Sequence, residues 1–263
     1  MSPMKFVDSH CHLDRYEDLA EVLSRAEKNA IEHIVSICVS RSNFTKVMEV
    51  LHNSPPWVSA SIGIHPSEVE HEDLESLESW LLHHAQHPRV VGIGETGFDH
   101  TPNFPSPEAQ LASFRLHHGA ALATGLPLLV HLRDAEASFF SYMRTQPKRA
   151  TGLLHCFTAS LSCAQEVLSW GWKISLSGIL TFPNASDLRE TVRQLPISGF
   201  LLETDGPWLA PQPYRGQRNE SAYLVETAKT LAMTLNVSLE DVAYHTTNTF
   251  YALFPKASRP NVK

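Results

Sequence analysis

Short apolar runs alternate with amphipathic runs from one end of the chain to the other. Each apolar run is rich in Val, Ile, Leu or Phe, which is typical of a strand buried on both faces. Strands of this kind belong to parallel sheets, in which helices connect one strand to the next. We predict eight of them, over residues 5–8, 33–39, 57–64, 90–95, 127–132, 152–157, 173–178 and 200–205.

Apolar side chains recur at helical spacing between several of these runs. Leu19, Val22, Leu23 and Ala26, for example, fall on one face of a helix. A repeated strand-then-helix order with eight strands predicts an α/β protein, a (β/α)8 TIM barrel with an extra C-terminal helix. The helices that this spacing predicts cover residues 17–30, 107–124, 221–235 and 239–253.

An open, doubly wound sheet is the alternative arrangement of the same elements. Such a sheet usually carries a glycine-rich phosphate turn after its first strand. The residues at that point are Ser9-His10-Cys11-His12, which favours the barrel. A length of 263 residues also suits one barrel, and no low-complexity segment divides the chain, so we predict a single domain over residues 1–263.

Composition and charge narrow the class of protein further. Hydrophobic residues make up 43% of the chain, and we find neither an apolar run long enough to span a membrane nor a signal peptide. The four cysteines form no CxxC pair, so we expect free thiols in a cytoplasmic protein without a membrane or a stable protein partner. The net charge of −7 argues against a broad cationic surface, but not against a phosphate substrate held by metal ions.

Histidine is the unusual feature of the composition, and one HxH motif ends the first predicted strand. Alternate residues of a strand face the same side, so His10 and His12 can bind one ion together. A chain with 15 histidines contains about 0.8 HxH pairs by chance, so the motif alone is weak evidence. Its position is stronger evidence, because other metal-capable residues also end predicted strands: Glu95, His131, His155 and Asp205.

These six side chains are expected to converge on one pocket. All C-terminal strand ends of a (β/α)8 barrel meet at one mouth, where active sites lie. A carboxylate at an apolar strand end also needs a counter-charge, which a metal ion supplies. Four imidazoles and two carboxylates suit two divalent ions about 3.5–4 Å apart, a pair that activates water and clamps the oxygens of a phosphoester.

The six residues can be divided between two ions. The predicted ligands of one ion are His10, His12 and Asp205. Those of the other are His131 and His155, with Glu95 as the bridge. Asp205 is also a candidate acceptor for the proton of the attacking water, so Asp205 and Glu95 are the predicted catalytic residues. By ligand preference alone, the histidines favour Zn, Mn, Co or Fe over Mg.

These residues resemble the TatD family of metal-dependent deoxyribonucleases, within the wider amidohydrolase-like set. The resemblance runs from Asp8 to about Phe254 and rests on the order and spacing of short blocks. The blocks are DSHCHLD (8–14), GIHP (63–66), GIGETGFD (92–99), HLRDA (131–135), HCF (155–157), ETDGP (203–207), RNE (218–220) and TNT (247–249). The family pattern places metal ligands at all six positions, and its members are often reported with Mg, so Mg, Mn, Zn and Co all remain candidates.

The resemblance implies a hydrolase that cleaves phosphodiester bonds in DNA or in another phosphoester. The alternative is an amide or ester hydrolase of the wider amidohydrolase set. Many of those enzymes use a carboxylated lysine as the bridge near strand four, where this chain has Glu95 and no lysine nearby. A non-catalytic metal-binding protein is a third hypothesis, which no feature of the sequence supports. The chain departs from the family pattern at Thr96, Phe98, His100 and Ser221.

Several other residues have two interpretations each. His65 is a candidate substrate-binding residue or a structural hydrogen-bonding group. Arg133 is a candidate phosphate ligand or part of a surface ion pair. Trp208 and Tyr214 are candidates for base stacking or for packing of a proline-rich loop.

Further polar residues are assigned to the surroundings of the site or to the surface. Asp8 and Asp99 are candidates for orienting ligands or for ordinary hydrogen bonding at a strand end. Cys11 and Cys156 are predicted to point away from the pocket into the core. Three loop cations are candidates for attracting a nucleic-acid backbone or are ordinary solvated loop residues, which is the favoured interpretation for each one singly: Arg15, Arg215 and Arg218. The histidines predicted to face solvent are His71, His83, His84, His87, His117 and His118.

Overall fold

Eight parallel strands form the centre of the molecule in a computed structural model that describes residues 4–257 and 259. Neighbours along the chain are neighbours in the sheet, from β1 through to β8. The strands are β1 (Phe6–Cys11), β2 (Ile31–Ser36), β3 (Val58–Ile62), β4 (Val90–Asp99), β5 (Leu128–Arg133), β6 (Gly152–Leu154), β7 (Lys173–Leu176) and β8 (Phe200–Leu202).

The sheet closes on itself where the first strand meets the segment that follows the last. The amide of Asp205 donates to the carbonyl of His10 at 2.9 Å, and the amide of His12 donates to the carbonyl of Gly206 at 2.8 Å. Cys11 and Gly206 form a parallel bridge between these hydrogen bonds. The predicted (β/α)8 barrel is therefore confirmed, and the open sheet is wrong.

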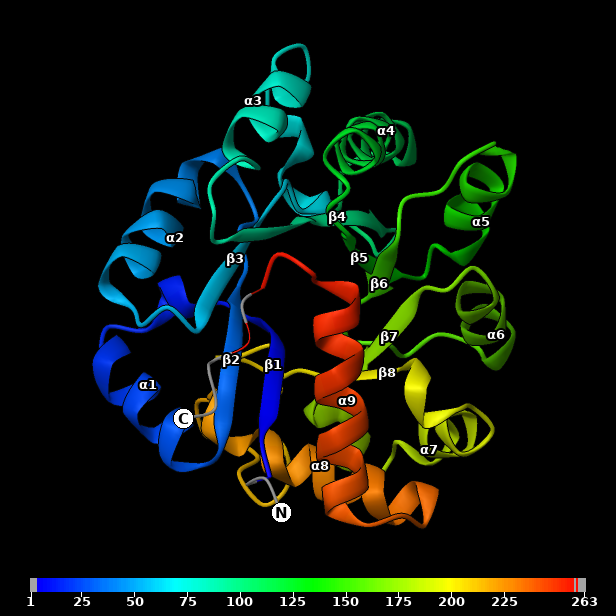
Figure 1. The fold of residues 1–263 in the computed structure, drawn as a ribbon. Helices are drawn as coiled ribbons and strands as arrows, with labels where there is room; N and C mark the ends of the chain where they lie inside the picture. Colours follow the sequence, from blue (N-terminus) through cyan, green and yellow to red (C-terminus); the bar gives the residue numbers. More distant parts are fainter. Residues whose placement is uncertain (1–3, 258, 260–263) are drawn as a thin grey trace.

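Helices surround the barrel, as Figure 1 shows. Their bounds are α1 (Leu19–Lys28), α2 (Arg41–Asn53), α3 (Leu77–His84), α4 (Pro107–Thr124), α5 (Glu136–Thr145), α6 (Leu161–Ser169), α7 (Ser186–Arg193), α8 (Leu224–Leu235) and α9 (Leu239–Leu253). Helix α4 has the predicted bounds because the Ser106 side chain caps its first turn and Gly125 ends it in the left-handed region at φ 71°. None of the described helices is long and apolar enough to cross a membrane.

Helix α9 lies across one end of the barrel (Figure 1). Thr247 of this helix donates a hydrogen bond to the carbonyl of Lys5, just before β1, so the covered end is the N-terminal one. Phe250 and Phe254 are fully buried there against side chains from the barrel interior, which are Val7, Val35, Val91, Leu129, Leu153 and Leu201. The extra C-terminal helix thus seals one end, and the C-terminal strand ends form the other.

The strand ends differ from the predictions mainly at this second end. Strand β4 continues four residues past Glu95, to Asp99. Strands β6 and β8 end three residues before the predicted bounds, at Leu154 and Leu202. The chain beyond them leaves the extended conformation: φ is 45° at Cys156 and 54° at Asp205. Because of these turns, the side chains beyond β6 and β8 no longer alternate between the two faces of the sheet, which the predicted bounds had assumed.

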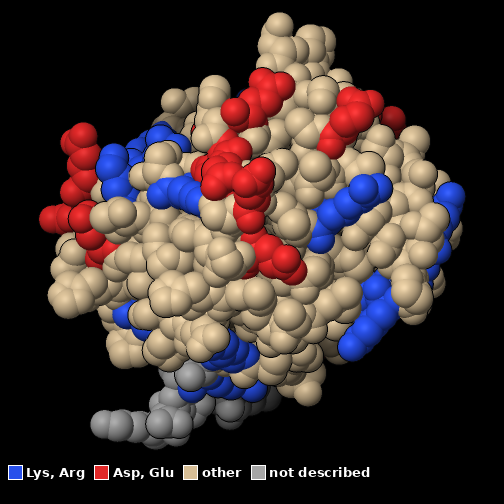
Figure 2. All heavy atoms as spheres, turned by 90° about the horizontal axis from the view of Figure 1, so that it is seen from above, with Lys and Arg blue, Asp and Glu red and all other residues tan. Residues whose placement is uncertain are grey.

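Acidic side chains gather on one side of the barrel. Figure 2 looks onto the side from which α3 projects, and red side chains form a band across its middle. The segment 66–78, which leads into α3, contains no lysine or arginine. Its acidic residues are Glu68, Glu70, Glu72, Asp73, Glu75 and Glu78. Lys and Arg side chains flank this band in Figure 2, so the acidic band, and not the whole side, is unsuited to binding a nucleic-acid backbone.

Candidate metal centre

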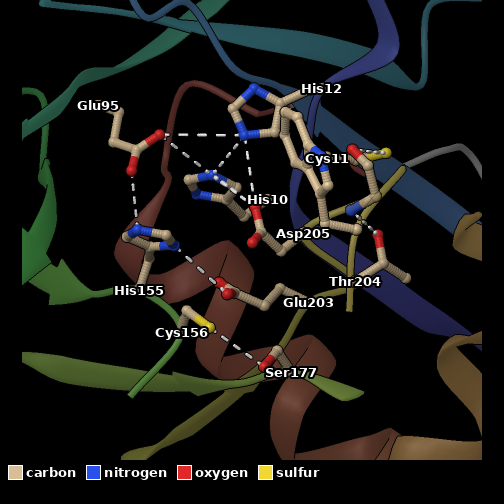
Figure 3. A network of polar contacts seen from close by, with 12 residues as sticks. His10, Cys11, His12, Glu95, His155, Cys156, Ser177, Glu203, Thr204 and Asp205 are labelled. Atoms are coloured by element: carbon tan, nitrogen blue, oxygen red, sulfur yellow. Dashed lines mark hydrogen bonds and ion pairs between the residues drawn. The ribbon is translucent and has the colours of Figure 1, made fainter. Parts of the chain in front are cut away.

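The six predicted ligands meet at the open, C-terminal end of the barrel. Most of them appear together in Figure 3, around the carboxylates of Glu95 and Asp205. Four are buried, and His131 and Asp205 are partly exposed. The convergence that strand order predicted is therefore observed, although the chain between His10 and Asp205 passes through all eight strands.

The first group of donors joins the two edges that close the barrel. His12 Nε2 lies 3.4 Å from Asp205 Oδ1, and His10 Nε2 lies 3.7 Å from the same oxygen. The two imidazole nitrogens are 3.3 Å apart. The ligand atoms of His10, His12 and Asp205 all lie within 4.8 Å of one another, a spacing that can hold a metal ion.

The second group of donors comes from strands β3 to β6. His131 Nδ1 lies 3.2 Å from Glu95 Oε1, and His155 Nε2 lies 2.8 Å from this oxygen. His65, which follows β3, adds Nε2 at 3.5 Å from the same oxygen. The ligand atoms of His65, Glu95 and His131 also lie within 4.8 Å of one another. His65, which was predicted as a substrate-binding residue, is therefore placed where it could also bind a metal ion.

Glu95 is the residue that the two groups share. Its Oε1 faces the second group, whereas its Oε2 lies 3.4 Å from His10 Nε2 and 4.0 Å from His12 Nε2. The backbone before it requires glycine: Gly94 has φ 138°, and a Cβ there would lie 2.3 Å from the carbonyl oxygen of Leu129. The sequence thereby sets the Glu95 carboxylate between neighbouring strands.

Histidines, and no lysine or arginine, are the ion-pair partners of these carboxylates among the described residues. Burial alone would raise the pKa of Glu95, but His155, His65 and His10 outweigh it and hold that pKa well below its usual value. Burial has the same tendency at Asp205, where the hydrogen bond from His12 holds the pKa low. Both carboxylates are therefore anionic and available to cations.

Two further carboxylates contact the far nitrogens of site histidines. Asp99 Oδ2 lies 3.0 Å from His131 Nε2, as expected for a residue that orients a ligand. Glu203 Oε1 lies 3.4 Å from His155 Nδ1, and the Ser175 hydroxyl donates to the other oxygen of Glu203. No role was predicted for Glu203 from the sequence; the available signal was a carboxylate directly after the apolar run 200–202, and the structure shows it to be fully buried.

Asp8 follows the second of its two interpretations, hydrogen bonding at the end of a strand. It accepts hydrogen bonds from the Thr204 amide at 2.9 Å and from the Thr204 and Ser221 hydroxyls at 2.6 Å each. Its contact with His10 is through the backbone amide and not through the ring. Asp8 therefore ties β1 to the segment after β8. Ser221, a departure from the family pattern, supplies one of these hydrogen bonds.

The donor set fits divalent metal ions. Imidazole nitrogens and carboxylate oxygens are the ordinary protein ligands of Zn, Mn and Co. The Nε2 atoms of His10 and His12 face each other beside two anionic carboxylates, which leaves a place for positive charge between them. Asp99 and Glu203 stand behind two of the imidazoles, the usual arrangement around a metal site.

The other residues singled out in the sequence divide between the mouth and the surface. Arg133 is exposed and makes no ion pair with a described residue. Arg218 pairs with Asp18 at 2.7 Å, Arg15 lies 3.5 Å from Asp14, and Arg215 lies over the ring of Phe182. These three loop cations are thus already engaged within the chain.

Two predicted surface histidines of α4 are buried, contrary to expectation. His117 Nε2 accepts a hydrogen bond from the Ile64 amide at 2.9 Å, and its Nδ1 lies 2.8 Å from the Ser113 carbonyl. Burial lowers the pKa of His117 to about 4, so this ring is neutral. His118 is buried between Tyr142 and Ala150. Both rings satisfy hydrogen bonds that an apolar residue would leave unmade.

The remaining histidines and cysteines mostly lie as predicted. His71 and His83 are exposed, and His84 and His87 are partly exposed. Cys11 is fully buried, as predicted. Cys156 is only partly buried and lies 3.2 Å from the Ser177 hydroxyl, so its predicted place in the core is wrong. The left-handed turn at Cys156 breaks the strand alternation that the prediction assumed.

A (β/α)8 barrel with histidines and carboxylates converging at its mouth is the architecture of a metal-dependent hydrolase. The sequence matches the model of the family described as "TatD related DNase" over residues 7–255. The chain therefore belongs to the TatD-related DNase family of metal-dependent hydrolases.

Relatives of this chain share its length as well as its sequence. It is 34% identical over 251 residues to the uncharacterized metal-dependent hydrolase YabD of Bacillus subtilis (strain 168), covering 94% of this chain and 98% of YabD. It is 33% identical over 259 residues to the uncharacterized metal-dependent hydrolase YcfH of Escherichia coli (strain K12), covering 95% and 96%. The crystal structure of YjjV, a TatD homologue from Escherichia coli K12, superposes with a TM-score of 0.85 at 26% identity, covering 96% and 98%.

Proposed function

We propose that the protein is a phosphodiesterase that cleaves DNA with two divalent metal ions, Mg, Mn, Zn or Co. The observation that carries the proposal is the position of Glu95, whose two oxygens face separate groups of donors. A carboxylate shared in this way is the arrangement expected of a bridge between two ions. Membership of a family described as related to DNases supports the choice of substrate.

Each site residue has a proposed role. One ion is assigned to His10, His12 and Asp205. The other is assigned to His131 and His155, with Glu95 as the bridge. When bound, two such ions lower the pKa of the attacking water and neutralise charge on the phosphoryl oxygens. Asp205, which is anionic and partly exposed, accepts the proton of that water.

Two residues are assigned to the substrate. Arg133 is the last residue of β5. It is exposed and has no ion-pair partner among the described residues, so its guanidinium is free to bind a phosphate. His65 is neutral at physiological pH, because burial lowers its pKa to about 4, and it can hydrogen-bond a phosphoryl oxygen. Its distance to Glu95 also admits a role as a ligand of the second ion.

The test uses bis-p-nitrophenyl phosphate and end-labelled single- and double-stranded DNA. Metal-stripped protein is refilled separately with Mg²⁺, Mn²⁺, Co²⁺ or Zn²⁺ before the assay. Hydrolysis is expected only with metal, and it should fall by at least about 100-fold in Glu95→Ala and in Asp205→Ala. His83→Ala, which changes an exposed histidine on α3, serves as the matched control and should behave as wild type.

The alternative hydrolase predicts the opposite pattern. If fully metal-loaded protein leaves every phosphodiester intact but hydrolyses esters or cyclic amides, the phosphodiesterase proposal is wrong. The presence of Glu95, and not a lysine, at the shared position argues against that outcome.

A further inference from the structure

Trp208 is an exposed aromatic side chain beside the metal centre. It is 49% exposed, and its ring centroid lies 5.0 Å from that of His12, with the planes crossing at 73°. The other exposed large hydrophobic residues among those described lie on α8, just after it, or on α9: Met233, Val237 and Tyr244. An apolar ring at this place is therefore not explained by a general excess of exposed hydrophobic surface.

The backbone of Trp208 is held by hydrogen bonds at both its amide and its carbonyl. Its amide donates to the carbonyl of Asp205 at 3.0 Å. The side-chain amide of Asn219 donates to the Trp208 carbonyl at 2.7 Å and to the Thr204 carbonyl at 2.8 Å. Because Asn219 is fully buried, its side chain holds the Trp208 backbone against the turn that carries Asp205. The indole is thus exposed on a well-anchored backbone.

Tyr214, the other aromatic residue singled out in this loop, packs against another ring of the chain. Its ring stacks on Tyr223 with centroids 3.8 Å apart and planes at 8°. One of its faces is therefore taken up by packing within the loop. Trp208 meets His12 only edge to face, which leaves ring surface open to a ligand.

We propose that Trp208 is a specificity-determining residue that stacks on the nucleobase next to the phosphate bound at the metal centre. This inference rests on the proposed phosphodiesterase function and deepens it. A phosphate held near His12 carries its nucleoside within reach of the indole beside that histidine. A base offers its flat face to the indole only when it is unstacked, so the preferred substrate is an unpaired or frayed strand.

The experiment compares two ligands that differ only in the base. Thymidine 5′-monophosphate and 2-deoxyribose 5-phosphate are titrated into metal-loaded protein, and both affinities are measured by calorimetry. Stacking on an aromatic side chain should make the nucleotide bind roughly 5- to 150-fold more tightly than the sugar phosphate. In Trp208→Ala that ratio should fall to about 1, and Trp208→Phe should restore most of it.

Tyr244→Ala is the matched control, because Tyr244 is an aromatic residue, 66% exposed, on the helix that covers the opposite end. It should keep the wild-type ratio. Equal affinities for the two ligands in wild type, or an unchanged ratio in Trp208→Ala, would overturn the inference. Binding is measured without turnover, so a protein that shows the preference but cleaves no DNA loses the proposed function while retaining the stacking site.

Discussion

Asp99 and Glu203 determine how two of the site histidines present their nitrogens. Each carboxylate contacts the nitrogen that faces away from Glu95, on His131 and His155 respectively. For His155, burial alone would lower the pKa, but Glu95 and Glu203 together raise it well above its usual value. A carboxylate behind an imidazole orients the ring and makes it a more basic ligand.

Changing Glu203 to Gln should weaken metal binding without unfolding the barrel. The substitution keeps the size of the side chain and removes the negative charge behind His155. Loss of such a partner typically lowers metal affinity about 10- to 100-fold. Calorimetric titration of the metal-free protein with Zn²⁺ measures this change directly.

Glu190→Gln provides the comparison, because Glu190 is exposed on α7 and pairs with Arg193. It should bind Zn²⁺ as wild type does. If Glu203→Gln also matched wild type, the Glu203 carboxylate would have no part in holding His155.

Among the elements, some were predictable and others were not. All eight strands could be located, because apolar runs of β-branched and large aliphatic residues are distinctive. Helices α4 and α9 could be bounded because Ser106 and Ser238 cap them. No bounds were predicted for α2, α3, α5, α6 or α7; α7 is only eight residues long, is mostly polar and buries only Val192.

The positions of the six ligands could be predicted more completely than the contacts of the side chains around them. Strand order alone brings six ligands to one mouth, since parallel strands share their direction. The burial of His117 could not be predicted, because α4 buries polar as well as apolar residues, including Gln110 and Ser113. A polar side chain on a helix is buried where another part of the chain offers it a hydrogen bond, as the Ile64 amide does for His117. Such tertiary contacts cannot be read from the sequence of the helix.

Helix α9 is expected to support the fold without acting on the site. Phe250→Ala would leave a cavity against the barrel interior and should reduce the free energy of unfolding by about 3–5 kcal/mol. Urea unfolding measures the loss. Metal affinity of the folded variant should stay at the wild-type value, because Phe250 lies at the opposite end of the barrel.

Tyr244→Ala on the same helix separates cavity formation from any change in helix propensity. Tyr244 is exposed, so its removal should change the free energy of unfolding by no more than about 0.5 kcal/mol. Equal losses in the two variants would mean that α9 does not seal the barrel through Phe250.

On the scale of the whole molecule, charge limits how nucleic acid can approach. The net charge is −7, and one side carries the acidic band seen in Figure 2. Arg15 and Arg218 lie against acidic partners. Arg133, the last residue of β5, is exposed and makes no ion pair with a described residue, so we expect it to be the main cationic contact for DNA. Contact with DNA should be confined to the mouth of the barrel.

Salt dependence tests this picture. For a single-stranded oligonucleotide, the slope of log kcat/KM against log salt should be no steeper than about −1.4, the value for two phosphate contacts. Arg133→Ala should flatten the slope by about 0.7. Steady-state rates over about 50–200 mM NaCl provide the measurement. A slope several times steeper would reveal a long cationic track and would contradict contact confined to the mouth.

The closure of the barrel between β1 and the segment after β8 has a consequence for synthesis in the cell. His10 and His12 leave the ribosome early, whereas Asp205 follows 195 and 193 residues later. Their group exists only once the ends of the barrel have met, so a nascent chain cannot assemble that part of the centre until the last strand has emerged. Any ion captured earlier would lack Asp205 as a ligand, and uptake at the full site would report that the barrel is complete.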